Sequence, residues 1–171
     1  MGISALFRRL FRIPAAPPTG AQAREGVHTC APAQTGVIPW RRSGEDIEYL
    51  LITSRRSARW LFPKGGVAGD MTPWDSAALE AEEEAGVEGR VSTDPLGRYG
   101  NTLNADPEAR VEIELYGLEV LHESESWLEE HQRQRRWAGY AEAVELLADP
   151  EKAELLAELD RRLAALPAEG R

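Results

Sequence analysis

The sequence predicts an α/β fold in which a mixed β-sheet is covered by helices. Three observations support this prediction. The chain has 171 residues, of which 42% are hydrophobic and 29% charged, so it is long enough for one domain with its own core. Short β-branched and apolar runs recur from Gln34 onward. Helical patterns stand between these runs and after them, and strands interleaved with helices form a sheet with helical layers.

The predicted strands are short runs separated by turn residues. The runs "TGVIPWRR" and "IEYLLITSRR" flank the turn "SGED", which predicts a hairpin. In "ARVEIELYGLEVL", apolar Val111, Ile113 and Leu115 alternate with other residues, as in a strand with one buried face. The remaining predicted strands are "RWLF", which ends at the turn "PKGG", then "EGRVSTDPLGRYGN" and "RRWAGY".

The predicted helices have recognisable ends. Pro73 suits the first turn of a helix, and Gly86 suits its end. Between them an alanine face is expected to pack closely on the sheet; it consists of Ala77, Ala78, Ala81 and Ala85. Two further helices are predicted near the C-terminus, "AEAVELLA" and then "PEKAELLAELDRRLAAL", the second beginning at Pro150.

Charge and cysteine content exclude several classes of protein. The formal net charge of −9 argues against a dedicated nucleic-acid binder, which would usually be basic. Cys30 is the only cysteine, which excludes an intramolecular disulfide and a cysteine-based zinc site. No apolar run approaches the roughly 20 residues of a membrane-spanning helix. We therefore expect a cytoplasmic protein.

Residues 1–30 differ from the domain predicted over residues 31–171. Five apolar residues recur at helical spacing, Ile3, Leu6, Phe7, Leu10 and Phe11, with arginines on the other face. One interpretation is an amphipathic arm whose residues 3–12 contact a membrane surface or a partner protein. The other is a helix folded back on the domain, or a disordered tail.

The predicted helix after Pro73 carries an unusual concentration of carboxylates. Glu80, Glu83 and Glu84 lie at i, i+3 and i+4, so they share one helix face, where like charges repel. Converging carboxylates suit hard divalent cations, which prefer oxygen ligands. The alternative is a solvated acidic face without a ligand.

This stretch resembles the Nudix box, G-x5-E-x7-R-E-U-x-E-E-x-G-U, where U is a bulky aliphatic residue. The matching positions are Gly65, Glu80, Glu83, Glu84, Gly86 and Val87. The first glutamate and the arginine of the box are replaced by Met71 and Leu79, and Ala81 is small for its aliphatic position. The box is therefore partly degenerate, and we expect Met71 and Leu79 to replace the missing electrostatic support by apolar packing.

The flanking segments resemble the diphosphoinositol-polyphosphate phosphohydrolase branch of the Nudix hydrolases. They are "IEYLLITSRRSARWLFPKGG", "GRVSTDPLGRY" and "WLEEHQRQRRWAGYAEAVELL". The resemblance spans residues 34–147. It implies a Nudix-type α/β/α sandwich and a pyrophosphohydrolase that cleaves a phosphoanhydride bond.

The resemblance also implies roles for individual residues. Glu80, Glu83 and Glu84 become the catalytic residues and the ligands of Mg2+ or Mn2+, with Glu80 also a candidate general base. The backbone carbonyl of Lys64 and a late-strand glutamate would add further ligands. Glu114 and Glu112 are the candidates for that glutamate, and the alternative for each is an exposed strand position.

Basic residues outside the box are expected to bind the phosphates of a small-molecule substrate. Arginine forks match phosphate geometry. The predicted substrate-binding residues are Arg55, Arg56, Lys64, Arg133 and Arg135. The alternative for each single arginine is a surface residue that binds no ligand. The substrate classes implied are diphosphoinositol polyphosphates, dinucleoside polyphosphates and related nucleoside diphosphate derivatives. A non-catalytic module that binds a phosphorylated ligand is the competing hypothesis, and both a monomer and a homodimer remain open.

Overall fold

The computed structural model describes residues 33–103 and 106–166. The predicted arm, residues 1–30, lies outside the described residues, as does Cys30. The strands and helices of the described chain follow one another in this order: β1 (Gln34–Ser43), β2 (Asp46–Thr53), β3 (Trp60–Leu61), β4 (Lys64–Gly66), α2 (Pro73–Ala85), β5 (Val87–Val91), β6 (Gly97–Leu103), β7 (Asp106–Glu123), β8 (Arg135–Ala138), α3 (Tyr140–Leu147) and α4 (Pro150–Ala165).

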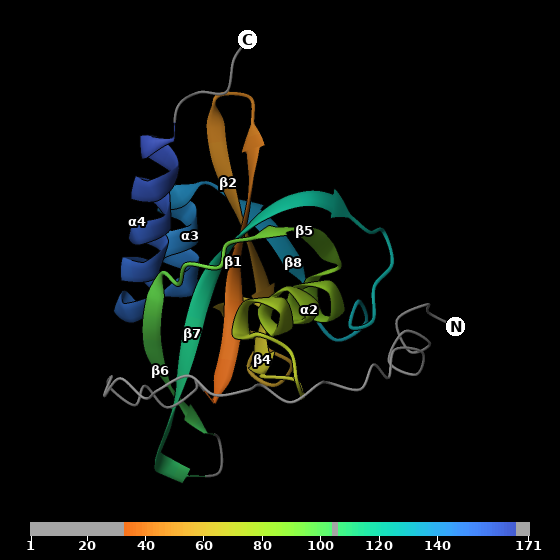
Figure 1. Ribbon diagram of the computed structural model, residues 1–171, viewed down its shortest axis with the longest axis vertical. Helices are drawn as coiled ribbons and strands as arrows, with labels where there is room; N and C mark the ends of the chain where they lie inside the picture. Colours follow the sequence, from red (N-terminus) through yellow and green to blue (C-terminus); the bar gives the residue numbers. More distant parts are fainter. Residues whose placement is uncertain (1–32, 104–105, 167–171) are drawn as a thin grey trace, which may run out of the picture. The chain divides into compact units, whose positions relative to one another are not determined.

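One mixed sheet joins these strands (Figure 1). β1 is central, because it pairs antiparallel with β2 and β4 on one side and parallel with β7 on the other. β7 pairs antiparallel with both β5 and β6. β2 pairs antiparallel with β8 on its side away from β1, and with the short β3 on the opposite side, since Ile52 pairs with both Arg135 and Leu61.

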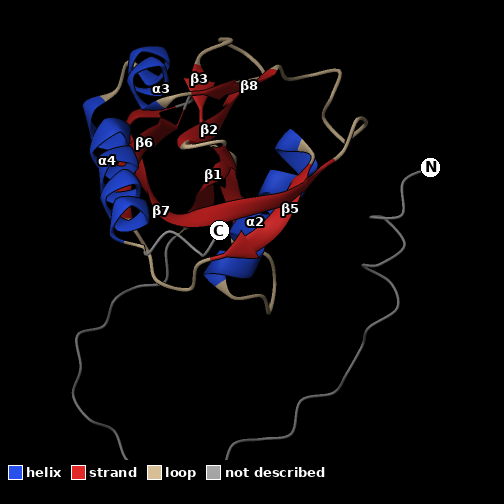
Figure 2. Cartoon of the chain, turned by 90° about the horizontal axis from the view of Figure 1, so that it is seen from above, coloured by secondary structure: helices blue, strands red, loops and turns tan. Residues whose placement is uncertain are grey.

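Helices cover both faces of the sheet. Figures 1 and 2 show α2 against one face and α3 with α4 against the other. On the first face Ala77, Ala81 and Ala85 are fully buried, which confirms the alanine packing face for these three residues, whereas Ala78 is only half-buried. On the second face Leu156 and Leu159 of α4 pack into the other hydrophobic cluster. The α/β/α sandwich is therefore confirmed. Separately, no helix in the described ranges is long and apolar enough to cross a membrane.

The local signals at α2 are also confirmed. Pro73 occupies the first turn, and the Thr72 side chain caps the helix by accepting from the Asp75 backbone N–H. Gly86 ends it in the left-handed conformation, with a φ of 67°. The hairpin predicted at "SGED" joins β1 to β2, with Ser43 opposite Asp46.

Two strand predictions need correction. The segment "PKGG" is not only a turn, because Lys64–Gly66 forms β4 and pairs with the start of β1. The segment "EGRVSTDPLGRYGN" is two strands, β5 and β6, which bind different stretches of β7. β4 pairs with the start of β1 and β5 with the far end of β7, in each case across intervening elements, which local periodicity does not record.

Candidate functional site

The carboxylates of α2 meet β4. Glu84 is 6% exposed, and its Oε2 accepts a hydrogen bond from the Lys64 backbone N–H at 3.0 Å. The Glu80 carboxylate lies directly against Gly65, where any Cβ would collide with it. Glycine at position 65 is therefore required for Glu80 to lie against the strand. The pairing that creates β4 thus places two predicted metal ligands beside backbone.

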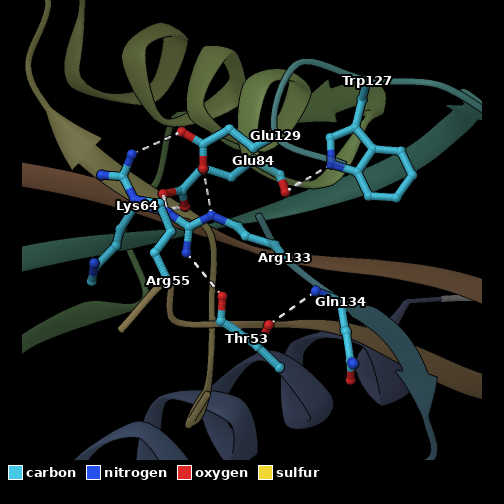
Figure 3. A network of polar contacts seen from close by, with 8 residues as sticks. All are labelled: Thr53, Arg55, Lys64, Glu84, Trp127, Glu129, Arg133 and Gln134. Carbon is cyan, nitrogen blue, oxygen red and sulfur yellow. Dashed lines mark hydrogen bonds and ion pairs between the residues drawn. The ribbon is translucent and has the colours of Figure 1, made fainter. Parts of the chain in front are cut away.

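Arg133 occupies the centre of this site (Figure 3). Its Nη2 forms an ion pair with Glu84 Oε1, and its Nε donates to Glu129 Oε2 at 2.6 Å. Its Nη1 donates to the Thr53 carbonyl at 2.9 Å. The interpretation of Arg133 as a surface residue is wrong, because only 8% of it is exposed. In this arrangement the Arg133 guanidinium neutralises the Glu84 carboxylate. Its predicted role was a different one, the binding of substrate phosphate.

Glu129 links this network to the loop after β2. Its Oε1 forms an ion pair with Arg55 Nη1 at 3.3 Å, and the Arg55 side chain is 57% exposed. Arg56, the next residue, is also exposed. The Glu129 backbone N–H donates to the Glu83 carbonyl at 3.2 Å, which ties this segment to α2. Arg55 is therefore a predicted substrate-binding arginine that remains open to a ligand beside this network, and Arg56 is exposed on the same loop.

Arg135 supports the fold instead of facing this site. Its Nη1 donates to the Ala85 carbonyl at 2.8 Å and its Nη2 to the Ser124 carbonyl at 2.9 Å. The guanidinium also lies 4.1 Å from the centre of the Trp127 ring. It thereby satisfies a carbonyl at the C-terminus of α2. The prediction that Arg135 binds substrate is not supported by this geometry.

Glu114 lies on the same sheet face as Glu80 but has other partners. It is 9% exposed, so the alternative of an exposed strand position is wrong for Glu114. Its Oε1 accepts from Arg98 Nε at 3.0 Å and its Oε2 from the Tyr116 hydroxyl at 2.5 Å. Glu112 is exposed. The register places Glu114 beside Thr35, which in turn pairs with Gly65, so Glu114 is two strands away from the Glu80 contact.

The two degenerate positions of the box behave differently. Met71 is 39% exposed, so the expected apolar packing is wrong for this residue. Leu79 is half-buried on α2. Met71 lies just before the helix, where its N–H donates to the Ala68 carbonyl at 2.9 Å. Its side chain consequently adds little support to the metal-binding face.

Burial and charge crowding shift the proton affinities of the site. Burial raises the pKa of Glu80 to about 7, and the neighbouring Glu84 and Glu83 carboxylates add to that rise. Burial lowers the pKa of Lys64, with Arg133 adding to this effect and Glu84 opposing it. Burial also raises the pKa of Glu84, while Arg133 and the Lys64 N–H oppose the rise. A carboxyl with a pKa near neutrality can exchange a proton in the working pH range.

The donor chemistry of the site fits a hard divalent cation. Glu80 and Glu84 offer carboxylate oxygens beside β4, and Glu83 projects from the same helix face. In residues 33–103 and 106–166 no three acidic, histidine or cysteine side chains already converge in metal-binding geometry. Arg133 holds one oxygen of Glu84, so a cation that binds there must share that carboxylate with the guanidinium or displace it.

Raising the pH from about 5 to about 8 is expected to lower the melting temperature of the metal-free protein. The Glu80 pKa of about 7 lies above its ordinary 4.5, so the folded protein keeps a proton that the unfolded chain releases. This stabilisation is fully present below the ordinary value and is lost as the pH rises through about 7. Thermal unfolding across this range measures it.

The Glu80→Gln variant should flatten that pH dependence, whereas Glu88→Gln, a change at an exposed position of β5, should leave it unchanged. An equal slope in all three proteins would show that Glu80 is not the responsible group.

Some residues of the site have little sequence signal. Glu129 stands four residues before Arg133, and that spacing is the one local hint of their ion pair. Thr53 contributes its backbone carbonyl, and its side-chain hydroxyl accepts from the Gln134 N–H at 2.9 Å. A carbonyl acceptor has no residue-type signature, so sequence alone could not have identified it.

Comparison with known proteins decides the family. The NUDIX domain family profile matches residues 32–159. The chain belongs to the Nudix family. Nudix hydrolase 16, mitochondrial, from Arabidopsis thaliana is 37% identical over 130 residues, which cover 67% of this chain and 72% of that relative. The resemblance noted from the box is thereby confirmed, and the chain is a Nudix-type pyrophosphohydrolase.

Relatives also include a member of the expected branch. Diphosphoinositol polyphosphate phosphohydrolase 3-alpha from Homo sapiens is 33% identical over 137 residues, covering 77% of this chain and 78% of that protein. Among solved structures, an Ap4A hydrolase from C. elegans superposes with a TM-score of 0.61 at 20% identity, covering 78% of this chain and 98% of that one. That structural likeness confirms the Nudix fold.

Proposed function

We propose that this Nudix enzyme hydrolyses a phosphoanhydride bond in an organic polyphosphate and depends on Mg2+ or Mn2+. Glu80, Glu83 and Glu84 would hold the cation, together with the backbone carbonyl of Lys64; Glu114 would join them only after turning from its present partners. The observation that carries the proposal is the contact of the Glu80 and Glu84 side chains with β4, beside the exposed Arg55. Bound there, the cation would neutralise charge that develops on the phosphates.

The protein's own residues supply the remaining chemistry. Glu80, with a pKa near neutrality, is suited to accept a proton from the attacking water. Arg55 and Arg56 are suited to bind phosphate oxygens, because both are exposed on the loop after β2 and Arg55 reaches Glu129 of the network. Arg133 orients Glu84 through their ion pair. These roles fall to residues of three segments. Glu80 lies on α2, Arg55 and Arg56 lie in the loop after β2, and Arg133 lies just before β8.

The proposed substrates are diphosphoinositol polyphosphates and dinucleoside polyphosphates. The first class is supported by the name of the human relative, and by a basic loop suited to several phosphates. The second is the class named for the C. elegans enzyme that shares this fold.

A phosphate-release screen with and without magnesium tests the proposal. Its substrates are dinucleoside polyphosphates, nucleotide sugars, nucleoside triphosphates and inositol pyrophosphates. We expect magnesium-dependent turnover of at least one dinucleoside polyphosphate or inositol pyrophosphate. Binding without turnover of any substrate would instead establish the non-catalytic module.

Three further properties are proposals from the sequence. They are a cytoplasmic location, a monomeric or homodimeric state, and a contact of residues 3–12 with a membrane surface or a partner protein. Cell fractionation, light scattering, and vesicle sedimentation with and without residues 1–24 test them respectively.

A further inference from the structure

The last carbonyls of helix α2 are bound by one segment distant in sequence. Four consecutive carbonyls, those of residues 83–86, accept hydrogen bonds from residues 124–135, here called the capping segment. The donors are the Glu129 N–H to Glu83 at 3.2 Å, the Trp127 indole N–H to Glu84 at 3.2 Å, the Arg135 Nη1 to Ala85 at 2.8 Å and the Ser124 N–H to Gly86 at 2.8 Å. A helix leaves its last carbonyls without intrahelical partners, so this segment supplies the C-terminal cap of α2.

Packing around Gly86 fixes this cap in place. A Cβ at position 86 would approach the Trp127 Cβ to 2.8 Å, so the Trp127 side chain lies directly against the glycine. The Arg135 guanidinium in turn lies 4.1 Å from the centre of the Trp127 ring. This cation–π contact orients the ring whose N–H binds the Glu84 carbonyl, as Figure 3 shows.

The capped turn is an unfavourable place for a helix. Its acidic side chains have no basic residue beside them in the last turn of α2. Negative charge at a helix C-terminus opposes the helix dipole, and Glu80 repels Glu83 and Glu84 across one turn. Helix ends also fray, and this end carries two of the proposed metal ligands. The turn therefore needs support from outside the helix to hold these carboxylates in one geometry.

The capping segment holds Glu84 by two of its groups. Trp127 binds the Glu84 backbone carbonyl, while Arg133 of the same segment forms an ion pair with the Glu84 carboxylate. Glu129 binds α2 through its backbone N–H, and its carboxylate pairs with Arg133 and Arg55. The backbone and the side chain of a proposed metal ligand are thus held by one stretch of chain.

We propose that the capping segment positions the metal-binding turn of α2, and that Trp127 is a positioning residue that fixes the backbone of Glu84. In this role Trp127 acts only through Glu84. The inference rests on the proposed function for its effect on the cation. Loss of a group that orients a metal ligand from outside typically weakens metal affinity by roughly 10–100-fold.

The first experiment measures backbone hydrogen exchange in the metal-free full chain carrying Trp127→Phe. Phenylalanine keeps a ring beneath the Arg135 guanidinium and removes the indole N–H. We expect the amides of residues 83–86 to exchange about fivefold faster than in wild type, as for the loss of one hydrogen bond that holds the turn.

Trp137→Phe is the matched control. The Trp137 indole N–H donates to Glu123 at 3.0 Å, and the Arg41 guanidinium lies 4.0 Å from the centre of the Trp137 ring. The same substitution therefore removes the same kind of hydrogen bond beside the same kind of cation–π contact, but away from the carbonyls of α2. Exchange in residues 83–86 should stay at the wild-type rate.

The second experiment measures manganese binding to the same proteins by electron paramagnetic resonance, without substrate. We expect Trp127→Phe to raise the Kd for Mn2+ about tenfold and Trp137→Phe to leave it unchanged. With the substrate that the screen identifies, Trp127→Phe should lower turnover at limiting magnesium and recover most of it at saturating magnesium, without a change in the KM for that substrate.

Three results would overturn the proposal. They are unchanged exchange in Trp127→Phe, faster exchange with unchanged manganese affinity, which would make the cap a purely structural feature, and equal effects of the two substitutions. A wild-type protein that binds no manganese would instead contradict the proposed metal site, and the exchange measurement would then decide alone whether the capping segment fixes this turn.

Discussion

Replacing Glu83 by Gln is expected to reduce magnesium-dependent turnover by a hundredfold or more. That factor corresponds to about 3 kcal/mol in the activation barrier. The substitution keeps the shape of the side chain and removes the charge of a proposed metal ligand on the face of α2 that carries Glu80 and Glu84. Steady-state kinetics at saturating magnesium measures the effect on the substrate that the screen identifies.

The neighbouring Glu82→Gln is the matched control. Glu82 is turned by about 100° from Glu83 along the helix, so its loss should change turnover little. Equal damage from both substitutions, or none from either, would mean that this part of α2 is a solvated acidic face and that the metal-site assignment is wrong.

Glu84→Gln is expected to differ from Glu83→Gln in stability as well. Like-charge repulsion alone predicts that the metal-free protein tolerates either substitution. The structure changes this expectation for Glu84, because its carboxylate is the buried partner of Arg133. A neutral amide removes one of the two carboxylates that pair with that buried guanidinium, the other being Glu129, so Glu84→Gln should lower both turnover and the free energy of unfolding.

Replacing Arg133 by Ala is expected to lower the free energy of unfolding by about 3–5 kcal/mol, the usual loss when one partner of a buried ion pair is removed. The side chains of Arg133 and Glu84 are 5% and 7% exposed. The change also removes the contacts with Glu129 and the Thr53 carbonyl. Denaturant unfolding without metal measures the loss.

Arg136→Ala is the control within the same segment. Arg136 pairs with Glu142 at the surface, where its side chain is 53% exposed, so its loss should cost less than about 1 kcal/mol. Magnesium should raise the melting temperature of Arg133→Ala more than that of wild type, because the cation no longer competes with a guanidinium for Glu84. Equal shifts would show that Arg133 and the cation do not compete.

The sequence by itself determined those features whose cause lies within a few residues. Pro73 and Gly86 predicted the ends of α2, and the alanine spacing predicted its buried face. The i, i+3 and i+4 spacing of Glu80, Glu83 and Glu84 predicted one acidic face, and the box spacing led to the family. Helix periodicity and turn chemistry are local, so they can be read from consecutive residues.

Only the tertiary structure decided which distant residues meet these carboxylates. Arg133 stands 49 residues after Glu84 in the chain, yet it becomes the buried countercharge of Glu84. β4 exists because β1 offers a free edge beside it, and Glu114 is buried because Arg98 and Tyr116 pair with it. In each case the partner is chosen by packing across the sheet. A sequence records the chemistry of a side chain but not the side chain that folding places opposite it.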